Sequence, residues 1–385
     1  MSKPSKSPAP QPHRPGLEAL RQEVDTADRQ LVDLLARRQR IVNQIIEAKR
    51  QGNLPAFHQA RQNDIIAARG KQAREAGLDP EIIEDVFRVI FRHSRVSQLR
   101  KLASRCARPG ASVLIVGGRG QMGQFFAHWF KQSGYAVRVL DRSDWANARQ
   151  LAAQTDLCLL SVPVHATADV TRQIAPHLPR DCVLADIASL KREPMEAMSS
   201  AHAGPVVGLH PLFGPDVASM DKQVVVCSPG RRAADCAWVL RQLEIWGNVI
   251  IQAVPGEHDE IMGIVQALRH FATFAFGQFL QRRNVSLNRA LAMSSPIYRL
   301  ELLMVGRLFA QDPVLYADIL LATPDRLALL KDYVESLKEN LMFIEPCDKE
   351  EFIARFRKLA EWFGPFTEDS MQESSLLIED MVRRS

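Results

Sequence analysis

A glycine-rich turn near residue 120 has the residue types and spacing to hold a phosphate group. The apolar run Val113–Gly117 leads into Gly118-x-Gly120-x-x-Gly123, and an amphipathic segment rich in phenylalanine follows. Glycines at this spacing let a pyrophosphate approach the N-terminus of a helix that follows a strand. The residues expected to contact it are Gly118, Gly120, Gln121, Met122 and Gly123. The turn therefore predicts a dinucleotide site.

Two further strand ends complete the expected cofactor site. Asp141 follows the run Ala136–Leu140, about 20 residues beyond the turn, where a carboxylate accepts hydrogen bonds from the ribose hydroxyls. An acid at this point repels a 2′-phosphate, so it favours NAD over NADP, although Arg142 comes next. Ser161 and Pro163 end another apolar run and are expected beside the nicotinamide half.

His210 is the candidate for a general base. It ends the run Val206–Leu209, and Ser189 lies just after the end of Val183–Asp186. Ligands of open α/β sheets bind outside the carboxyl ends of the strands. Oxidation of an alcohol needs a group that accepts the hydroxyl proton, and imidazole suits this task near neutral pH. Ser189 could hydrogen-bond the ring or the substrate hydroxyl.

The C-terminal third places cations within apolar helical segments. Arg307 follows Leu300, Leu303 and Met304 at helical spacing, so we expect its guanidinium to project toward a cavity. A buried Arg must be paired, either with a protein acid or with a substrate carboxylate, and the sequence leaves both open. Further candidates in or before these segments are Lys191, His258, His270 and Arg299.

A second group of cations lies in the first hundred residues. Arg38 and Lys49 continue one apolar stripe and are eleven residues apart, about three helical turns. Ser94 and Gln98 form an i,i+4 polar pair on the apolar stripe of the third helical segment. Arg61 lies at the start of the middle helical segment. Such side chains inside a helical core need an anion such as a dicarboxylate; the alternative is a solvated basic face. Nucleic acid is disfavoured because the cations face inward.

Three folded regions must position these residues. Residues 17–105 show only helical periodicity, one long helix and two shorter ones, and their thin core suggests an intertwined dimer. After a linker at 106–112, strands alternate with helices over 113–255, which predicts a mainly parallel, doubly wound sheet. Residues 256–385 are helical again, and 1–16 read as a disordered tail. The remaining predicted strands are 157–162, 224–227 and 249–252.

The composition excludes several classes of protein. The formal charge of +5 is mild for 385 residues, and we expect neither nucleic-acid nor membrane partners, since no apolar run approaches the roughly 18–20 residues that span a bilayer. The six cysteines are scattered without a C-x-x-C pair, which favours a reduced, cytoplasmic protein with no metal site.

Four longer motifs carry a family resemblance. They are Val-Gly-Gly-Arg-Gly-Gln-Met-Gly, Gly-Leu-His-Pro-Leu-Phe-Gly-Pro-Asp, Gln-Ala-Leu-Arg-His-Phe-Ala-Thr-Phe-Ala and Ser-Ser-Pro-Ile-Tyr-Arg-Leu-Glu-Leu. From about Leu17 nearly to its end, the chain closely resembles the bifunctional chorismate mutase/prephenate dehydrogenases of tyrosine biosynthesis. The resemblance implies an all-helical mutase domain followed by an NAD-dependent dehydrogenase.

For the helical domain, the resemblance implies a chorismate site. Arg38 and Arg61 match arginines that bind the substrate, and Arg21 matches one that reaches across from the partner subunit. Lys49 and Gln98 match the pair that hydrogen-bonds the breaking ether oxygen. This rearrangement needs no base, only a held conformer and positive charge where the oxygen becomes negative.

Three other positions of that site deserve mention. Ser94 matches a residue near the ring carboxylate. Many relatives have Glu where Gln62 stands, and some have Asp where His58 stands. Because Gln can still hydrogen-bond the ring hydroxyl, we expect altered activity or pH dependence rather than none.

For the second half, the resemblance implies oxidative decarboxylation of prephenate to 4-hydroxyphenylpyruvate and CO2. His210 matches the residue that accepts the hydroxyl proton, Ser189 its orienting partner, and Arg307 the residue that grips the ring carboxylate. Supporting roles are implied for Lys191, His258 and His270. The family also implies a homodimer and feedback inhibition by tyrosine at or near the prephenate site.

Two other functions fit parts of the sequence. In one, only the dehydrogenase is active and the helical piece serves dimerisation and regulation, its mutase activity lost through Gln62 and His58. In the other, the chain is a non-catalytic NAD-dependent sensor or repressor; the set His210, Ser189 and Arg307 argues against this. Chorismate turnover without NAD would separate the first alternative from a bifunctional enzyme.

Overall fold

A computed structural model describes residues 16–51, 59–102, 104–217, 219–321, 323–345 and 348–383. The chain folds as two compact units that meet in sequence at Arg105 and Cys106. The predicted tail, the break at Gly52–Pro55 and His58 lie outside the described residues, apart from Gly16. So do the side chains of four predicted mutase residues, Lys49, Arg61, Gln62 and Gln98.

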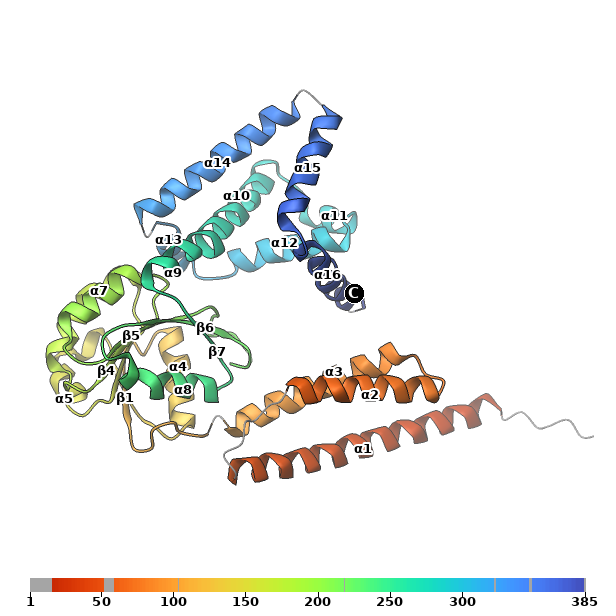
Figure 1. The fold of residues 1–385 in the computed structure, drawn as a ribbon, viewed down its shortest axis with the longest axis horizontal. Helices are drawn as coiled ribbons and strands as arrows, with labels where there is room; N and C mark the ends of the chain where they lie inside the picture. Colours follow the sequence, from red (N-terminus) through yellow and green to blue (C-terminus); the bar gives the residue numbers. More distant parts are fainter. Residues whose placement is uncertain are drawn as a thin grey trace, which may run out of the picture. The chain divides into compact units, whose positions relative to one another are not determined.

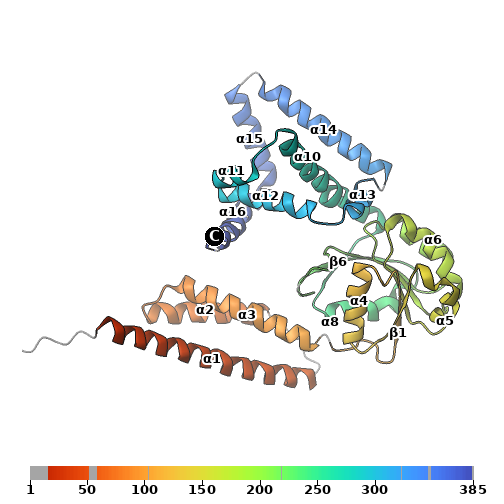
Figure 2. The same ribbon diagram turned by 180° about the vertical axis from the view of Figure 1, so that it is seen from behind.

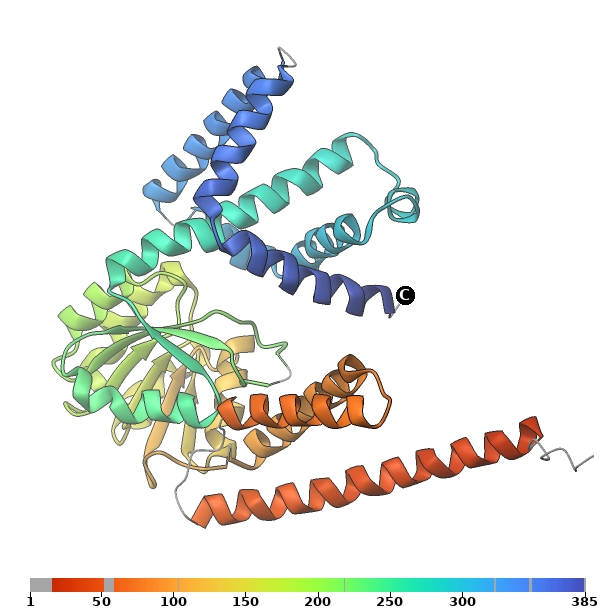
Figure 3. The same ribbon diagram turned by 45° about the vertical axis from the view of Figure 1, so that its right-hand side comes forward.

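The first unit consists of three helices, as the helical periodicity predicts. They are α1 (Leu17–Gln51), α2 (Gln59–Glu75) and α3 (Pro80–Leu102). Gly77 ends the second helix in the left-handed conformation at φ +74°, and Pro80 begins the third. Helices α2 and α3 pack side by side (Figure 3), with Ala73 and Phe91 buried.

Helix α1 keeps much of its apolar face exposed in a single chain. Leu31, Leu34 and Ile41 are each about half exposed, at 58%, 59% and 48%. Contiguous apolar surface of this kind marks an interface with another molecule.

The second unit contains a seven-stranded sheet in the order β2-β1-β3-β4-β5-β6-β7. All neighbouring strands are parallel except β5 and β6, which pair antiparallel. The mainly parallel, doubly wound sheet is therefore confirmed, with one reversed pair. The strands are β1 (Ser112–Val116), β2 (Ala136–Leu140), β3 (Leu157–Leu160), β4 (Val183–Asp186), β5 (Val206–Pro211), β6 (Val224–Pro229) and β7 (Val249–Gln252).

Helices flank this sheet on both sides (Figures 1 and 2). They are α4 (Gln121–Gln132), α5 (Ala148–Ala152), α6 (Val164–Ile174), α7 (Arg192–Ala201) and α8 (Ala237–Ile245). The central strands are buried on both faces and are accordingly almost wholly apolar; every residue of β3 and β4 is buried. Asp186 is the acidic exception at the end of β4, so it must be paired.

The chain leaves the sheet through α9 (Pro255–Met262) and continues into a helical region (Figure 1). A π-helical turn, η4 (Gly263–Leu268), joins α9 to α10. Single π-helical turns are rare and often lie at functional sites. The later helices are α10 (Arg269–Arg282), α11 (Leu287–Ala292), α12 (Pro296–Phe309), α13 (Pro313–Leu321), α14 (Pro324–Ile344), α15 (Lys349–Phe363) and α16 (Phe366–Arg383).

Within the described ranges, none of the helices is both long and apolar enough to cross a membrane.

Gly117 offers a test of the turn that follows β1. Its φ is +78°, and a Cβ there would collide with the carbonyl oxygen of Ser161. Gly134 has φ +85° but open space around a Cβ, which makes it a matched control. We expect Gly134→Ala to cost about 1–2 kcal/mol of unfolding free energy from backbone strain alone. Gly117→Ala should cost about 2–5 kcal/mol because overpacking adds to that strain.

The comparison is made by urea unfolding followed by tryptophan fluorescence, since four of the five tryptophans lie between residues 129 and 246. Equal losses in the two variants would show that the close approach to Ser161 adds nothing.

Candidate active sites

The glycine turn forms a cradle at the N-terminus of α4. A Cβ on Gly123 would lie 2.5 Å from the oxygen of Gly117 and 2.6 Å from the Cα of Gly118, so the helix can approach the strand only without one. A Cβ on Gly120 would meet only the oxygen of Gly117, at 3.3 Å. Gly120 is also the N-cap of α4 and supplies no side-chain cap. The first N–H groups of the helix are therefore left for an anion.

The left-handed residue of the turn is Gly117, one position before the predicted motif. Sequence reasoning placed Gly117 at the end of the strand and missed its role. Its φ of +78° could not be read from glycine spacing, because Gly118 stands beside it.

A cavity of about 420 Å³ adjoins this turn. Its lining includes Gly120, Asp141, Ser161 and Pro163, so the structure brings predicted cofactor residues of three segments together. Each oxygen of Asp141 accepts one backbone hydrogen bond, Oδ2 from Arg119 N at 3.1 Å and Oδ1 from Arg142 N at 2.8 Å. These bonds fix the carboxylate and leave lone pairs for further donors. The cradle, the acid and the cavity together fit a dinucleotide.

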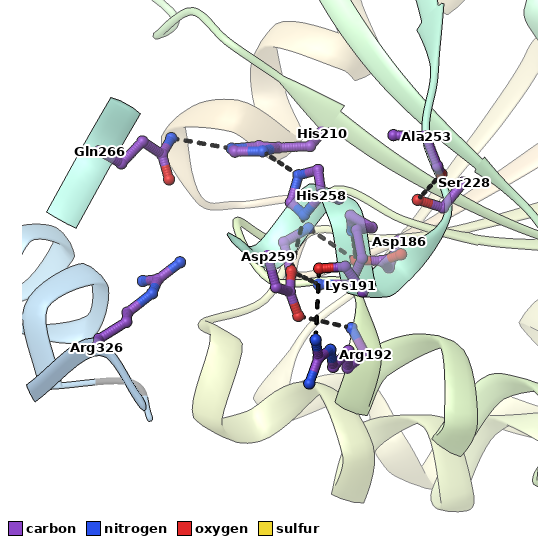
Figure 4. Close-up of polar contacts among 12 residues, drawn as sticks. Asp186, Lys191, Arg192, His210, Ser228, Ala253, His258, Asp259, Gln266 and Arg326 are labelled. Carbon is purple, nitrogen blue, oxygen red and sulfur yellow. Dashed lines mark hydrogen bonds and ion pairs between the residues drawn. The ribbon is translucent and has the colours of Figure 1, made fainter. Parts of the chain in front are cut away.

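His210 lies in a chain of hydrogen bonds at the end of β5 (Figure 4). Its Nδ1 is 2.8 Å from Nε2 of His258, whose Nδ1 is 2.7 Å from Oδ1 of Asp259. On the other side, Nε2 of Gln266 is 3.2 Å from Nε2 of His210. His210 and His258 are almost fully buried, so the chain is shielded from bulk water.

The carboxylate of Asp259 sets which atom donates in each of these hydrogen bonds. A carboxylate only accepts hydrogen bonds, so Nδ1 of His258 donates to Asp259. With both imidazoles neutral, Nε2 of His258 then accepts from Nδ1 of His210. The lone pair of His210 is therefore at Nε2, where the amide of Gln266 donates to it. The fold leaves this atom of His210 ready to accept a proton.

Burial also affects the charges of His210 and Asp259. It lowers the pKa of His210 well below its usual value, and the nearby charges of Lys191 and Arg326 act in the same direction. Burial by itself would raise the pKa of Asp259, but hydrogen bonds from His258 and from the backbone of Arg192 and Lys191 hold it below its usual value. His210 is thus neutral near pH 7, as a base must be.

Asp259 and Gln266 were not among the predicted site residues. Asp259 was visible in the sequence only as the neighbour of His258. Gln266 opens the motif Gln-Ala-Leu-Arg-His, but its place depends on η4, a turn that periodicity does not reveal.

Lys191 is fully buried and forms an ion pair with Asp186, which also accepts from Ala188 N at 2.9 Å. Burial raises the pKa of Asp186 and lowers that of Lys191, and the opposite charge of each partner offsets part of the shift. The prediction that Lys191 belongs to the site is consistent with its position, since its charge reaches His210.

The expected burial of Arg307 proves wrong, and of the two alternatives for Ser189 the structure does not show the bond to the ring. The guanidinium of Arg307 is not buried; its side chain is 59% exposed and pairs with Asp216 at 2.8 Å. This face of α12 is exposed in the single chain. The sequence left two partners possible for Arg307, a protein acid or a substrate carboxylate, and in this structure its partner is a protein acid, Asp216. Ser189 does not hydrogen-bond the ring of His210, because His258 and Gln266 occupy both ring nitrogens.

The remaining predicted residues of this half lie on the C-terminal helices. His270 packs its ring edge-to-face against Tyr316, with centroids 4.8 Å apart, and its Nδ1 is buried with no partner in the described structure. Burial, together with the charge of Arg269, lowers the pKa of His270 to about 4. Arg299 is exposed on α12.

In the first unit, the structure brings Arg38 and Ser94 together. Nη1 of Arg38 donates to Oγ of Ser94 at 3.1 Å, and the guanidinium lies 5.3 Å from the ring centroid of Phe91. Ser94 is buried, and burial lowers the pKa of Arg38. Arg21 is exposed and pairs only loosely with Glu18 at 3.5 Å. An inward-facing cation thus stands where the sequence predicted one.

Three family models match the chain in succession. They are chorismate mutase type II over residues 20–99, the nucleotide-binding domain of prephenate dehydrogenase over 132–252, and its dimerization domain over 254–358. The T-protein of Enterobacter agglomerans is 45% identical over 94% of this chain and 97% of its own length. The chain belongs to the T-protein family. The T-protein of Haemophilus influenzae is 42% identical over 94% of this chain and 96% of its own.

These matches decide among the three functions that fit the sequence. The chain joins a chorismate mutase to a prephenate dehydrogenase, as the motifs predicted. The two alternatives, a dehydrogenase alone and a non-catalytic sensor or repressor, are not supported.

Solved structures support the fold of the second half. The prephenate dehydrogenase of Aquifex aeolicus, in complex with hydroxyphenyl propionate and NAD+, aligns with a TM-score of 0.53 at 20% identity, over 69% of this chain and 99% of its own. The arogenate dehydrogenase of Synechocystis aligns with a TM-score of 0.50 at 17% identity, over 67% and 99%.

The buried pair of Lys191 and Asp186 gives a stability prediction. Asp186→Asn leaves an unpaired ammonium in a site with no solvent access, so we expect a loss of about 3–5 kcal/mol. The double variant Asp186→Leu with Lys191→Met removes both charges and should unfold within about 1–2 kcal/mol of the parent chain. Urea unfolding measures both; a double variant as unstable as Asp186→Asn would contradict this account.

Proposed function

We propose that the N-terminal helices rearrange chorismate to prephenate and that the second half converts prephenate to 4-hydroxyphenylpyruvate and CO2, with NAD as oxidant. The observation that carries the second reaction is the directed chain from Gln266 through His210 and His258 to Asp259. It leaves one lone pair, at Nε2 of His210, for a hydrogen-bond donor.

The turn after β1 would hold the cofactor. NAD, when bound, supplies the acceptor for a hydride from C4 of prephenate. The N–H groups at the start of α4 would face its pyrophosphate, and Asp141 would accept from the ribose hydroxyls, which favours NAD over its 2′-phosphorylated form. The Aquifex aeolicus relative, of similar fold, was solved with NAD+.

His210 would accept the proton of the C4 hydroxyl. The amide of Gln266 occupies this position in the free protein, at 3.2 Å, and the hydroxyl would replace it as the donor to Nε2. When Nε2 takes the proton, the positive charge on the ring is stabilised by Asp259 through His258. Ser189 would then hydrogen-bond the substrate hydroxyl, since the ring nitrogens of His210 are both in use.

Arg307 would bind the ring carboxylate that leaves as CO2. Its guanidinium already forms an ion pair with Asp216 at 2.8 Å. The substrate carboxylate would therefore replace Asp216 or bind beside it. Lys191, His270 and Arg299 would support the site, Lys191 through its field at His210 and His270 through its packing on Tyr316. Departure of CO2 makes the ring aromatic, which drives the step.

The mutase requires no base, because the rearrangement is pericyclic. Arg38, held by Ser94 and stacked over Phe91, would bind a substrate carboxylate in a site where few water molecules screen the charge. Lys49 and Gln98 would donate to the ether oxygen as it becomes negative. We propose further contacts from Arg61 and Gln62 of the same subunit, and one from the partner subunit's Arg21.

The assembly that we propose is a homodimer in the cytoplasm. Residues 254–358 match a dimerization domain, and α1 exposes an apolar face. The cysteines that the structure describes, Cys106, Cys158, Cys182, Cys227 and Cys236, are free thiols, in keeping with a reducing compartment. We also propose feedback inhibition by tyrosine at the prephenate site, which excess prephenate should relieve in an assay of NADH formation.

His210→Asn tests the assignment of the base. Asparagine keeps a polar group but cannot accept the proton, so the prephenate-dependent rate should fall by about 10²–10⁴-fold. Chorismate turnover without NAD should stay unchanged, because the mutase residues belong to the other unit. The measurement is a pair of assays on one purified variant. An unchanged rate of NADH formation would remove His210 from the mechanism.

Arg38→Gln tests the mutase site. Loss of a partly buried cation that binds substrate should lower kcat/KM for chorismate by about 10²-fold. The adjacent Arg37 is exposed, so Arg37→Gln is the matched control and should stay within about twofold. The dehydrogenase rate of both variants should equal that of the parent. Similar mutase losses in the two variants would indicate a solvated basic face instead of a site.

A further inference from the structure

Arg326, in the first turn of α14, has a buried guanidinium with unused donors. The residue is only 3% exposed. Its Nη1 donates to the carbonyl oxygen of Ile319, while Nε and Nη2 have no partner in the described part of the chain. Buried cationic donors are costly to leave unpaired, so a partner from outside the chain is expected.

Asp259, the acid whose charge acts on Arg326, does not satisfy these donors. Burial lowers the pKa of Arg326, and the charge of Asp259 offsets part of that shift. Oδ1 of Asp259 accepts from His258 Nδ1 and from Lys191 N, and its Oδ2 accepts from Arg192 N at 3.0 Å. Asp259 is thus committed to the His210 chain and to the start of α7, and it makes no hydrogen bond with Arg326.

The free atoms form the edge of the guanidinium that suits a carboxylate. Nε–H and Nη2–H point in parallel and bind the two oxygens of one carboxylate at once. Figure 4 shows the side chain extending from α14 toward Asp259 and Gln266.

Arg326 lines a cavity of about 390 Å³ whose apolar walls include Leu190, Ile264 and Leu329. This volume is in the range of small-molecule sites. The acids Glu193, Glu260 and Asp325 also line it, but they are exposed, so solvent screens their charge. His210, Ser189 and Arg307 are not among the lining residues.

We propose that this cavity is a second ligand site, for a small molecule with a carboxylate and an apolar body, and that Arg326 binds the carboxylate. Asp259 lines the same cavity and ends the hydrogen-bond chain of His210. If the proposed role of His210 is correct, a ligand there changes the dehydrogenase rate from outside the prephenate site. Binding itself does not depend on that role.

Phenylacetate is a suitable probe, because it consists of one carboxylate and one apolar ring. Its binding to the full chain is measured by ligand-observed NMR without substrate or cofactor. We expect saturable binding that weakens at least tenfold in Arg326→Gln and is unchanged in Arg307→Gln. A cooperative urea-unfolding transition close to that of the parent chain, followed by tryptophan fluorescence, shows that the second unit of Arg326→Gln is folded. If that variant does not fold, Leu329→Trp, which fills the cavity and keeps the guanidinium, should weaken binding instead.

Three results would overturn the proposal. No saturable binding means that the cavity takes no carboxylate. Loss only in Arg307→Gln places the probe in the prephenate site. Loss in both variants means one continuous site rather than a second one. Failure of the proposed function is separate, because it would appear as NADH formation that does not depend on His210.

Discussion

The carboxylate of Asp259 is the group that organises the polar contacts around His210. It accepts the backbone N–H groups of Lys191 and Arg192 at the start of α7, and it accepts from Nδ1 of His258. The first contacts join α9 to the sheet domain, and the last sets the tautomers of His258 and His210. One side chain thus links α9 to the start of α7 and fixes the hydrogen-bond direction at His210, the base that we propose.

Most of the buried polar groups around His210 form a hydrogen bond or an ion pair within the chain. Lys191 pairs with Asp186, and the imidazole of His210 donates a hydrogen bond to that of His258. Burial lowers the pKa of His210, which keeps it neutral and able to accept a proton. Among the described residues, Arg326 is the arginine that keeps two buried donors, Nε and Nη2, without a partner. The two unused donors of Arg326 are the basis of the second ligand site that we propose.

Much of the fold and part of the sites could be predicted. Strands β2, β4 and β7 begin and end where the predicted runs do, because valine and isoleucine, which recur in these runs, favour strands. The antiparallel pairing of β5 with β6 was not predicted, since pairing direction leaves no trace in composition. Arg307 was expected in a cavity from helical spacing alone, but spacing does not tell which face of α12 another element covers.

The sequence by itself determined the elements, the glycine turn and the candidate base, because those depend on residues close in the chain. Tertiary structure decided which side chains meet. Arg38 reaches Ser94 across 56 residues and His210 reaches His258 across 48, and no local pattern encodes either contact. The lone pair at Nε2 of His210 is therefore a property of packing: it exists only where α9 brings Asp259 and His258 against the end of β5.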